Sequence, residues 1–368
     1  MKFLHTADWH IGIKAAHLGG AGPWARAQRL RSARRVIDAA NARGVDFVLV
    51  AGDTFDDNSV SPDAAAETAA ILETSAAPVY VIPGNHDYLC PGSLWERPEF
   101  AGSGKIRLLA DAEPVDIGPA VLYPCPIRER RGTADPTAWI PAAESPGGKP
   151  RVALAHGSVE GLPQDAPDFP IPRGLADEKG LDYAALGHWH SFARYESGGA
   201  CRMAYCGTHE ATRFGRPGSG FADVVTINGR GAAPEIEQIA AAGLTWVDME
   251  ETVACGGDIR AVAESILGIG SGESTLVRVA LSGVCAVDDV DALSELRAVG
   301  DSGRFLHFEL DDAGLSLLHG GAGTGWIAGI GEPLVRKTAE RLAAAAAKTA
   351  ALDRALLELC LLAKGASR

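Results

Sequence analysis

The sequence lacks paired cysteine motifs and long apolar runs, and each absence excludes a class of protein. Its seven cysteines are scattered and form no CxxC pair, which is typical of reduced thiols rather than of a disulfide framework or a cysteine-rich zinc site. The opening MKFLHTADWH has too short an apolar run for a signal peptide, and no stretch is long and apolar enough to span a bilayer. We therefore expect a soluble, cytoplasmic protein.

An excess of positive charge is also missing. The net charge is -13 and the pI is about 5.2, which weighs against a protein that coats nucleic acid through a generally basic surface. Net charge does not describe its distribution, so the arginines at 26–35 and 128–131 leave room for a local basic groove. Each single arginine is more simply interpreted as solvated surface.

The 368 residues are enough for two or three domains, and the first half predicts a layered α/β fold. Short apolar runs alternate with helical patterns at 26–44 and 62–76, which is typical of α/β layers. Runs such as FVLV indicate strands that are covered on both faces. We expect strands at 3–7, 46–53, 78–85, 120–127, 151–157, 182–190, 202–209 and 222–229.

After residue 232 the alternation changes. Strands at 274–284 and 304–312, with helices near 257–268 and 288–299, predict a small α+β domain over 233–318. The first domain then covers 1–232.

Two segments follow this small domain. Residues 319–332 are rich in glycine and predict a flexible linker. Residues 333–368 predict one C-terminal helix, because Pro333 suits its first position and Gly365 its end. Apolar and small residues keep a spacing of three and four along this helix.

Five of the predicted strands end in polar clusters. In an open α/β sheet, ligands bind outside the carboxyl ends of the strands, so clusters that are distant in sequence can converge there. Residues two apart on an extended chain point to the same side, which suits Asp-x-His and His-x-His pairs. The clusters are Asp8-Trp9-His10, Gly52-Asp53-Thr54-Phe55-Asp56, Gly84-Asn85-His86-Asp87, His156-Gly157 and Gly187-His188-Trp189-His190.

These residue types predict a metal site. Carboxylate, imidazole and amide donors without cysteine suit Mn²⁺, with Fe²⁺ or Mg²⁺ as alternatives, better than a structural zinc. Asp53 is the natural bridge between two cations, and the glycines before the donors permit a close backbone approach. Each cluster by itself has a simpler interpretation, as a turn, a helix cap or a hydrogen-bonded core histidine. Five in series favour one shared site.

In series, these motifs resemble the calcineurin-like metallophosphoesterase superfamily. TADWHIG, GDTFDD and GNHD are similar to its Mre11/SbcD-type DNA repair exonuclease branch, although Cys206 stands where that branch often has serine. The resemblance covers residues 1 to about 230. It implies a four-layer β-sandwich flanked by helices, with a small α+β capping domain and a C-terminal helix.

The resemblance also implies a role for each matching residue. Asp53 would bridge two metal ions; Asp8, His10 and His190 would complete one site, and Asn85, His156 and His188 the other. A metal-bridging water would be the nucleophile. His86 would assist the leaving group, and Asp56 would orient His86 and raise its pKa.

The implied function is a Mn²⁺-dependent DNA phosphodiesterase in repair, an exonuclease with endonuclease activity as a further option. The alternative is a metallophosphoesterase that acts on another diester or a monoester, such as a cyclic nucleotide or a phosphoprotein. The superfamily's protein phosphatases carry an arginine where this chain has Asp57, and a carboxylate there favours diesters over dianionic monoesters. A catalytically silent scaffold is a third hypothesis, against which the complete donor set argues.

Partners follow from the resemblance alone. The C-terminal helix would bind a coiled-coil ABC-type ATPase like SbcC or Rad50, unless it packs on its own domain. The capping domain would contact DNA, although its aspartates make this contact doubtful. Homodimerisation through the catalytic domain is a further expectation, and we expect no membrane partner.

Overall fold

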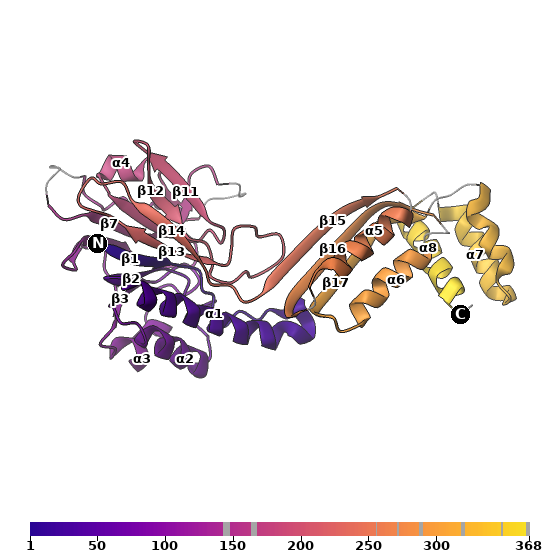
Figure 1. Cartoon of the computed structure of the whole chain (residues 1–368), viewed down its shortest axis with the longest axis horizontal. Coiled ribbons are helices and arrows are strands. Elements are labelled where there is room, and N and C mark those ends of the chain that lie inside the picture. Colours follow the sequence, from indigo (N-terminus) through magenta and orange to yellow (C-terminus); the bar gives the residue numbers. More distant parts are fainter. Residues whose placement is uncertain are drawn as a thin grey trace. The chain divides into compact units, whose positions relative to one another are not determined.

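The computed structural model describes residues 1–142, 148–162, 168–254, 256–270, 272–286, 290–317, 321–346 and 349–365. The chain divides into two compact units, Met1–Leu244 and Thr245–Arg368 (Figure 1). The division falls later than the predicted one at 232. The reason is that β14 (Glu235–Ala240) pairs along its whole length with β13 (Phe221–Thr226) and so extends the first unit.

The first unit contains two six-stranded sheets. In the first sheet β1 to β4 run parallel, and β13 and β14 continue it antiparallel beside β1. Its order is β14, β13, β1 (Lys2–Thr6), β2 (Phe47–Ala51), β3 (Val79–Ile82) and β4 (Ile106–Leu108). The second sheet has parallel central strands and antiparallel edges. Its order is β11 (Ala193–Ser197), β12 (Ala200–Tyr205), β10 (Tyr183–Gly187), β7 (Arg151–His156), β6 (Val121–Cys125) and β5 (Val115–Asp116). A short pair, β8 (Ser158–Val159) and β9 (Pro170–Ile171), lies beside them.

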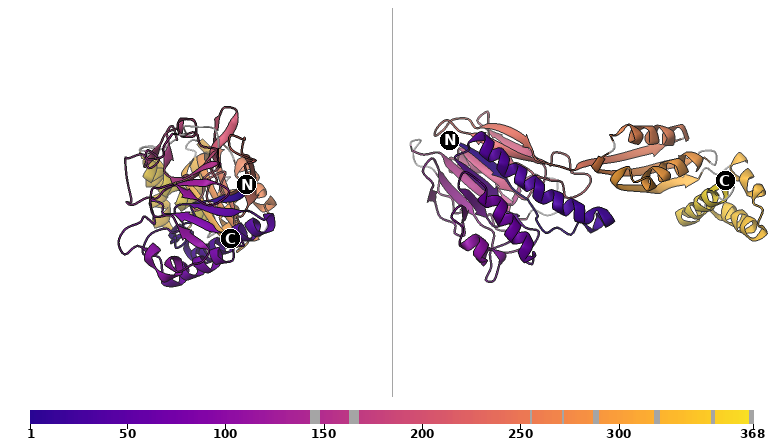
Figure 2. Two further views of the ribbon diagram at one scale, coloured as in Figure 1. Left: turned by 90° about the vertical axis from the view of Figure 1, so that its left-hand side faces the viewer. Right: turned by 60° about the horizontal axis from the view of Figure 1, so that its bottom comes forward.

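Three hydrophobic clusters hold the layers together. Between the sheets, Phe3 stacks on Phe47 with ring centroids 4.9 Å apart, and aliphatic side chains of β7 pack against them. The outer face of the first sheet is covered by α1 (Gly22–Arg43) and α2 (Pro62–Glu73), as Figure 2 also shows. The outer face of the second sheet is covered by α4 (Leu175–Lys179) and neighbouring loops. The predicted layered α/β fold is confirmed.

Local signals in the sequence set the ends of the two long helices. Pro23 occupies the first turn of α1, and Gly44 ends it in the left-handed conformation at φ 57°. Ser61 caps α2 by accepting a hydrogen bond from the backbone N–H of Ala64 at 3.3 Å. Shorter helical segments are η1 (Ala16–Ala21), η2 (Leu94–Glu96) and α3 (Pro98–Ala101).

The second unit is built on a three-stranded sheet. Its strands are β15 (Thr245–Val253), β16 (Gly272–Cys285) and β17 (Phe305–Leu317), and all are parallel. Helices α5 (Gly256–Gly268) and α6 (Val290–Asp301) make the crossover connections that parallel strands require. Their apolar faces pack on one side of the sheet.

The C-terminal segment differs from the single helix that we expected. It forms α7 (Pro333–Ala345) and α8 (Ala350–Gly365), because Thr349 restarts the helix by accepting a bond from the N–H of Leu352. The apolar face of α8, with Leu356, Leu357 and Cys360 buried, packs into the core of the second unit.

The expected flexible linker at 319–332 also differs in its described part. Residues Gly321–Gly329 form the 3-10 helix η4, and its Ile327 packs with Ile330 against Ala339 of α7. Apolar side chains among the glycines give this segment a packed face. Within the described part of the chain, no helix combines the length and hydropathy that crossing a membrane needs.

Candidate metal centre

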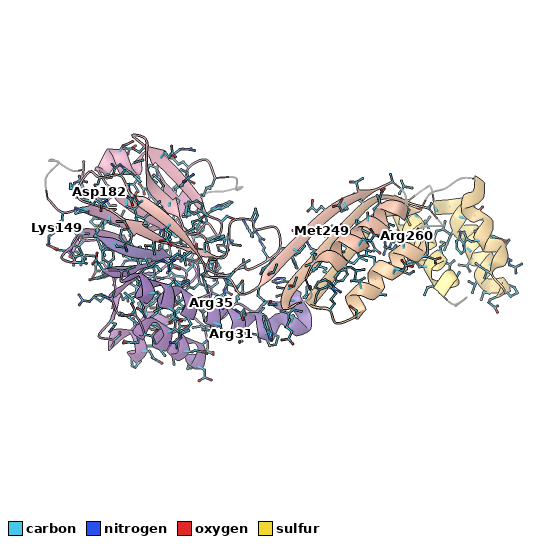
Figure 3. The ribbon with its side chains drawn as sticks, in the orientation of Figure 1. Arg31, Arg35, Lys149, Asp182, Met249 and Arg260 are labelled. Carbon is cyan, nitrogen blue, oxygen red and sulfur yellow. The ribbon has the colours of Figure 1, made fainter. Side chains whose placement is uncertain are left out.

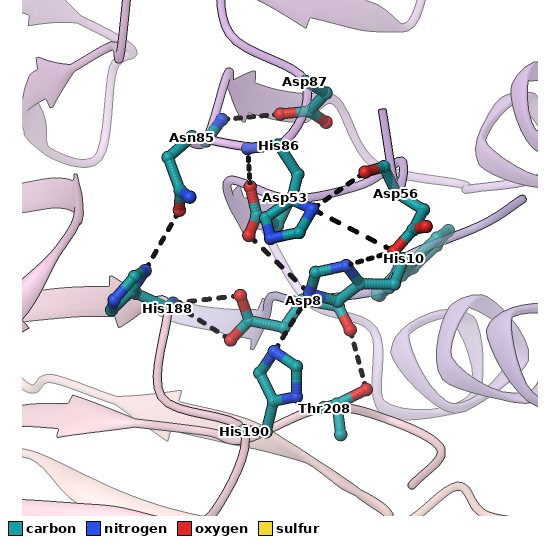
Figure 4. Close-up of polar contacts among 12 residues, drawn as sticks. Asp8, His10, Asp53, Asp56, Asn85, His86, Asp87, His188, His190 and Thr208 are labelled. Carbon is teal, nitrogen blue, oxygen red and sulfur yellow. Dashed lines mark hydrogen bonds and ion pairs between the residues drawn. The ribbon is translucent and has the colours of Figure 1, made fainter. Parts of the chain in front are cut away.

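The polar clusters meet because their strands run parallel and end at one edge of the two sheets. Asp8 and His10 follow β1, Asp53 follows β2, and Asn85 follows β3. His156 ends β7 in the second sheet, and His188 with His190 follow β10. The structure thus brings all seven predicted ligands to one place, most of them buried. Figure 4 labels six of them, all except His156.

The backbone around these residues is strained. Four of the six non-glycine residues with positive φ in the described chain are Asp8, His10, Asp53 and His188. Such left-handed conformations cost about 1–3 kcal/mol each and persist only where neighbours hold them. Here Asp8 N–H donates to the carbonyl of Gly52 at 3.1 Å, and His10 N–H to that of Asp53 at 2.9 Å.

Glycines allow the strands to approach one another at the site. A β-carbon on Gly84 would overlap the carboxylate and backbone nitrogen of Asp53. A β-carbon on Gly187 would overlap the carbonyl of Ala51 and come within 2.9 Å of His156 Nδ1. Both positions therefore exclude any side chain, as the sequence suggested.

One side of the site contains two facing histidines. The Nε2 atoms of His10 and His190 lie 2.9 Å apart, and Asp53 Oδ2 lies 3.6 Å from His10 Nε2. The other ring nitrogens are engaged elsewhere: His10 Nδ1 lies 3.2 Å from Asp56 Oδ1, and His190 Nδ1 lies 3.3 Å from Thr212 Oγ1. A histidine whose Nδ1–H donates to a carboxylate keeps a lone pair on Nε2, which it can present to a cation.

The other side has the same organisation around Asn85. Its Oδ1 atom lies 2.9 Å from His156 Nε2 and 3.0 Å from His188 Nδ1. His156 Nδ1 donates to the carbonyl of Ala51 at 2.9 Å, which directs Nε2 into the site. Asp53 Oδ2 is 3.4 Å from that Nε2 atom, so Asp53 faces both sides. The carboxylate of Asp8 accepts the N–H of His188 at 2.9 and 3.1 Å.

The electrostatics of the site centre on Asp53. Its pKa is lowered despite burial, because His156 and His10 lie beside its carboxylate. The pKa of His156 is raised to about 9 despite burial, because Asp53 and Asp8 favour its positive charge. Burial, opposed by His156 and assisted by Asp53, raises the pKa of Asp8 to about 7. Buried carboxylates thus favour positive charge at this point.

This donor set fits divalent cations. Among the described residues there are three sets of three donors, and within each set the donor atoms lie within 4.8 Å of one another: Asp8–His10–His190, His10–Asp53–His86 and Asp8–Asp53–His156. The first and third groups consist only of predicted ligands. The second includes His86, for which we expected no metal contact. Oxygen and imidazole donors without cysteine suit Mn²⁺, Fe²⁺ or Mg²⁺.

His86 differs from the ligands in its exposure and in its anchor. Its side chain is 32% exposed, and its Nδ1 lies 2.8 Å from the backbone carbonyl oxygen of Asp56, to which it donates. The Asp56 carboxylate lies 4.0 Å from that Nδ1 and instead approaches His10. We expected the Asp56 side chain to orient His86. Its backbone carbonyl does so, while its carboxylate orients His10.

Arg29 and Thr208 lie at the site although no motif marks them. We interpreted the arginines at 26–35 as surface residues, but Arg29 is only 3% exposed. It shares the buried face of α1 with Ala33 and Val36, so an arginine at a core-facing helical position is the signal that could have revealed it. Its guanidinium binds Trp9, Ala211 and Thr208.

Trp9, Trp189 and His209 lie near the motifs, and each packs against or bonds to the surrounding protein. Trp9 is fully buried and donates to Thr6 Oγ1 at 2.7 Å. His209 is buried, with Nε2 3.0 Å from the carbonyl of Arg29. Trp189 is partly buried and lies below the guanidinium of Arg216.

A two-sheet α/β fold with clustered Asp, His and Asn donors at its strand ends forms a candidate centre for divalent metal ions. The calcineurin-like phosphoesterase family model matches residues 1–192, and the chain belongs to this family. The family uses a dinuclear metal site, which the donors around Asp53 fit.

Several proteins of known sequence are similar to parts of this chain. The uncharacterized metallophosphoesterase YhaO of Bacillus subtilis is 29% identical over 208 residues, which cover 52% of this chain and 48% of that protein. The DNA double-strand break repair protein Mre11 of Archaeoglobus fulgidus is 37% identical over 91 residues, or 24% of this chain and 19% of that protein. The SbcD component of the nuclease SbcCD of Bacillus subtilis is 36% identical over 97 residues, or 24% and 22%. The matched segments thus cover about half of YhaO and less than a quarter of Mre11 and of SbcD. The predicted resemblance to Mre11 and SbcD is supported.

Proposed function

We propose that this protein is a dinuclear-metal phosphodiesterase that cleaves DNA in repair as an exonuclease, with endonuclease activity as a further option. The observation that carries the proposal is the convergence of seven donors, Asp53 among them, with the partly exposed His86 beside them. The partial similarity to Mre11 and to SbcD favours DNA as the substrate.

The residues of the site divide into those that would bind the metal ions and those that would orient the ligands or take part in the reaction. Asp8, His10, Asp53, Asn85, His156, His188 and His190 would hold the cations. When bound, two such cations polarise phosphoryl oxygens and acidify a water that serves as the nucleophile. The Asp56 carboxylate would keep His10 directed inward.

His86 would act on the leaving oxygen. Its Nδ1 proton is committed to the carbonyl of Asp56, so the ring would need a second proton on Nε2, which it would deliver to the departing alkoxide or use to stabilise the alkoxide's charge. Its backbone N–H donates to Asp53 Oδ1 at 2.8 Å, which fixes it relative to the metal ligands. No protein nucleophile is required.

Asp57 favours a diester substrate. Its Oδ1 atom accepts from the N–H and the hydroxyl of Ser59, at 2.6 and 2.5 Å, so the carboxylate is held in one orientation. A second carboxylate directly after Asp56 in the sequence would repel a dianionic monoester more than a monoanionic diester. Mn²⁺ is the metal that we propose, with Fe²⁺ or Mg²⁺ as alternatives.

The test compares three substrates with Mn²⁺: para-nitrophenyl phosphate, its bis-ester and end-labelled linear duplex DNA. The proposal expects cleavage of DNA and of the bis-ester and little release from the monoester. An Asp53→Asn variant purified in parallel controls for contaminating nucleases. Turnover of the bis-ester without any DNA cleavage would rule out DNA as the substrate.

The second candidate is a phosphoesterase that acts on another diester or on a monoester. Its support is that the longest of these three matches is to a metallophosphoesterase described only as uncharacterized. Preference for the monoester, or for a cyclic nucleotide over DNA, would favour it.

Partners are also proposals. We propose a coiled-coil ABC-type ATPase partner for the C-terminal helices, homodimerisation through the first unit, and a cytoplasmic location in which the cysteines stay reduced. Leu334 on α7 is 73% exposed and is available for a contact. Removing residues 333–368 would also remove buried Leu356 and Leu357 from the second core, so Leu334→Glu is the sharper test of ATPase binding.

A further inference from the structure

We propose that Arg29 is a positioning residue whose buried guanidinium holds the segment Asp8-Trp9-His10 in the conformation that divalent metal binding needs. This inference rests on the proposed function, because it takes the site around Asp53 to be a metal centre. Arg29 itself touches none of the donor atoms.

The guanidinium binds three acceptors at once. Its Nε donates to the carbonyl of Trp9 at 2.5 Å, its Nη1 to the carbonyl of Ala211 at 3.1 Å, and its Nη2 to Thr208 Oγ1 at 2.9 Å. Hydrogen bonds from a charged donor are about twice as strong as neutral ones, and a planar fork fixes their directions. Burial lowers the pKa of Arg29 to about 10, so it keeps its charge at neutral pH.

The first contact falls where the backbone is strained. The carbonyl of Trp9 lies between Asp8 at φ 54° and His10 at φ 43°, both left-handed. Non-glycine residues leave this conformation unless the surroundings hold them. The bonds from the segment that follows β2 hold the N–H side of both residues, and Arg29 holds the carbonyl between them.

The second contact joins this segment to the loop that follows β12. Thr208 Oγ1 accepts from Arg29 and lies 2.7 Å from the carbonyl of Asp8, to which it donates. Figure 4 shows this bond between Thr208 and Asp8. Arg29 therefore joins the segment Asp8-Trp9-His10 to the loop after β12 through one buried group.

The experiment measures Mn²⁺ binding by calorimetry to the full chain after treatment with EDTA and desalting. Arg29→Met should raise the Kd for Mn²⁺ at least tenfold, and Arg29→Lys, which keeps the charge but not the fork, should raise it less. Thr208→Val, a substitution of nearly equal shape, should raise it about threefold. With Mn²⁺ in excess, kcat of Arg29→Met should return to within about threefold of wild type.

Arg202→Met is the matched control. Like Arg29, Arg202 binds three acceptors, in its case the backbone carbonyls of Asp182, Ala232 and Gly231, but it lies near the start of β12, at the opposite end of the strands. Asp182 is labelled in Figure 3. If the role of Arg29 is specific, Arg202→Met lowers the melting temperature and leaves the Kd for Mn²⁺ within twofold.

Three results would overturn the inference: an unchanged Kd in Arg29→Met, equal weakening in Arg202→Met, or a kcat that excess Mn²⁺ does not restore. If Arg29→Met does not fold, the test is made with Thr208→Val. An unchanged Kd of Thr208→Val for Mn²⁺ would count against the positioning role of Arg29. A wild-type protein that binds Mn²⁺ without cleaving DNA refutes only the proposed substrate. A wild-type protein that binds no Mn²⁺ refutes both.

Discussion

Replacing Asp223 by asparagine should make the protein more stable in alkaline solution. Asp223 lies on β13 opposite His5 of β1 and is fully buried. Within the described residues neither of its carboxylate oxygens has a hydrogen-bond partner. Burial alone raises its pKa to about 8 from the ordinary value of 3.8. A buried carboxylate without partners takes up a proton rather than keep its charge.

The direction of the effect follows from proton counting. Between pH 4 and pH 8 the folded chain holds a proton on Asp223 that the unfolded chain has released. The folded state is therefore destabilised progressively as pH rises through this window, and the loss is complete above the folded pKa. A pKa of about 8 against 3.8 corresponds to a ceiling of about 5–6 kcal/mol. Water entry and relaxation reduce such penalties, so we expect about 1–3 kcal/mol at pH 8.5.

Urea denaturation of both proteins at pH 5, 7 and 8.5, followed by tryptophan fluorescence, measures the effect. Asparagine resembles the protonated acid, so the two proteins should be similar at pH 5 and diverge as pH rises. Other groups titrate equally in both and cancel in the difference. Asp116→Asn, which removes an exposed carboxylate paired with Lys149, is the control and should show no such divergence. A difference between wild type and Asp223→Asn that stays constant with pH would refute the reasoning.

Three further predictions concern the metal centre. Gly84→Ala should abolish measurable Mn²⁺ binding, because the added methyl group overlaps Asp53. The control is Gly104→Ala, whose methyl group meets only open space and which should bind Mn²⁺ as wild type does. Equal affinities of the two variants for Mn²⁺ would contradict the packing described. His86→Gln should lower kcat by about 10²–10⁴-fold with Mn²⁺ affinity nearly unchanged, measured by turnover and calorimetry, and unchanged turnover would exclude it from catalysis. Asp56→Asn should weaken Mn²⁺ binding about 10–100-fold, because the carboxylate that orients a ligand histidine is lost, and calorimetry showing wild-type affinity would contradict this.

Much of the fold was predictable because its signals are local. Apolar runs such as FVLV marked the central strands, and the helical patterns at 26–44 and 62–76 marked α1 and α2. The position of the donors followed from one rule about the ends of parallel strands, which needs only the order of elements.

What the sequence could not reveal depends on distant contacts. Arg29 stands in a run of arginines, and only the packing of α1 buries it. Whether the side chain or the backbone of Asp56 meets His86 depends on side-chain direction and not on spacing. The division of the C-terminal segment depends on where α8 finds apolar surface in the second unit.

The packing of α8 has a consequence for synthesis on the ribosome. The three-stranded sheet of the second unit is finished at Leu317, yet its core includes Leu356 and Leu361. The first unit has all of its strands once Ala240 has emerged, so it can fold early. The second must wait for a segment made some forty residues after its last strand, and until then its apolar face is open to chaperones.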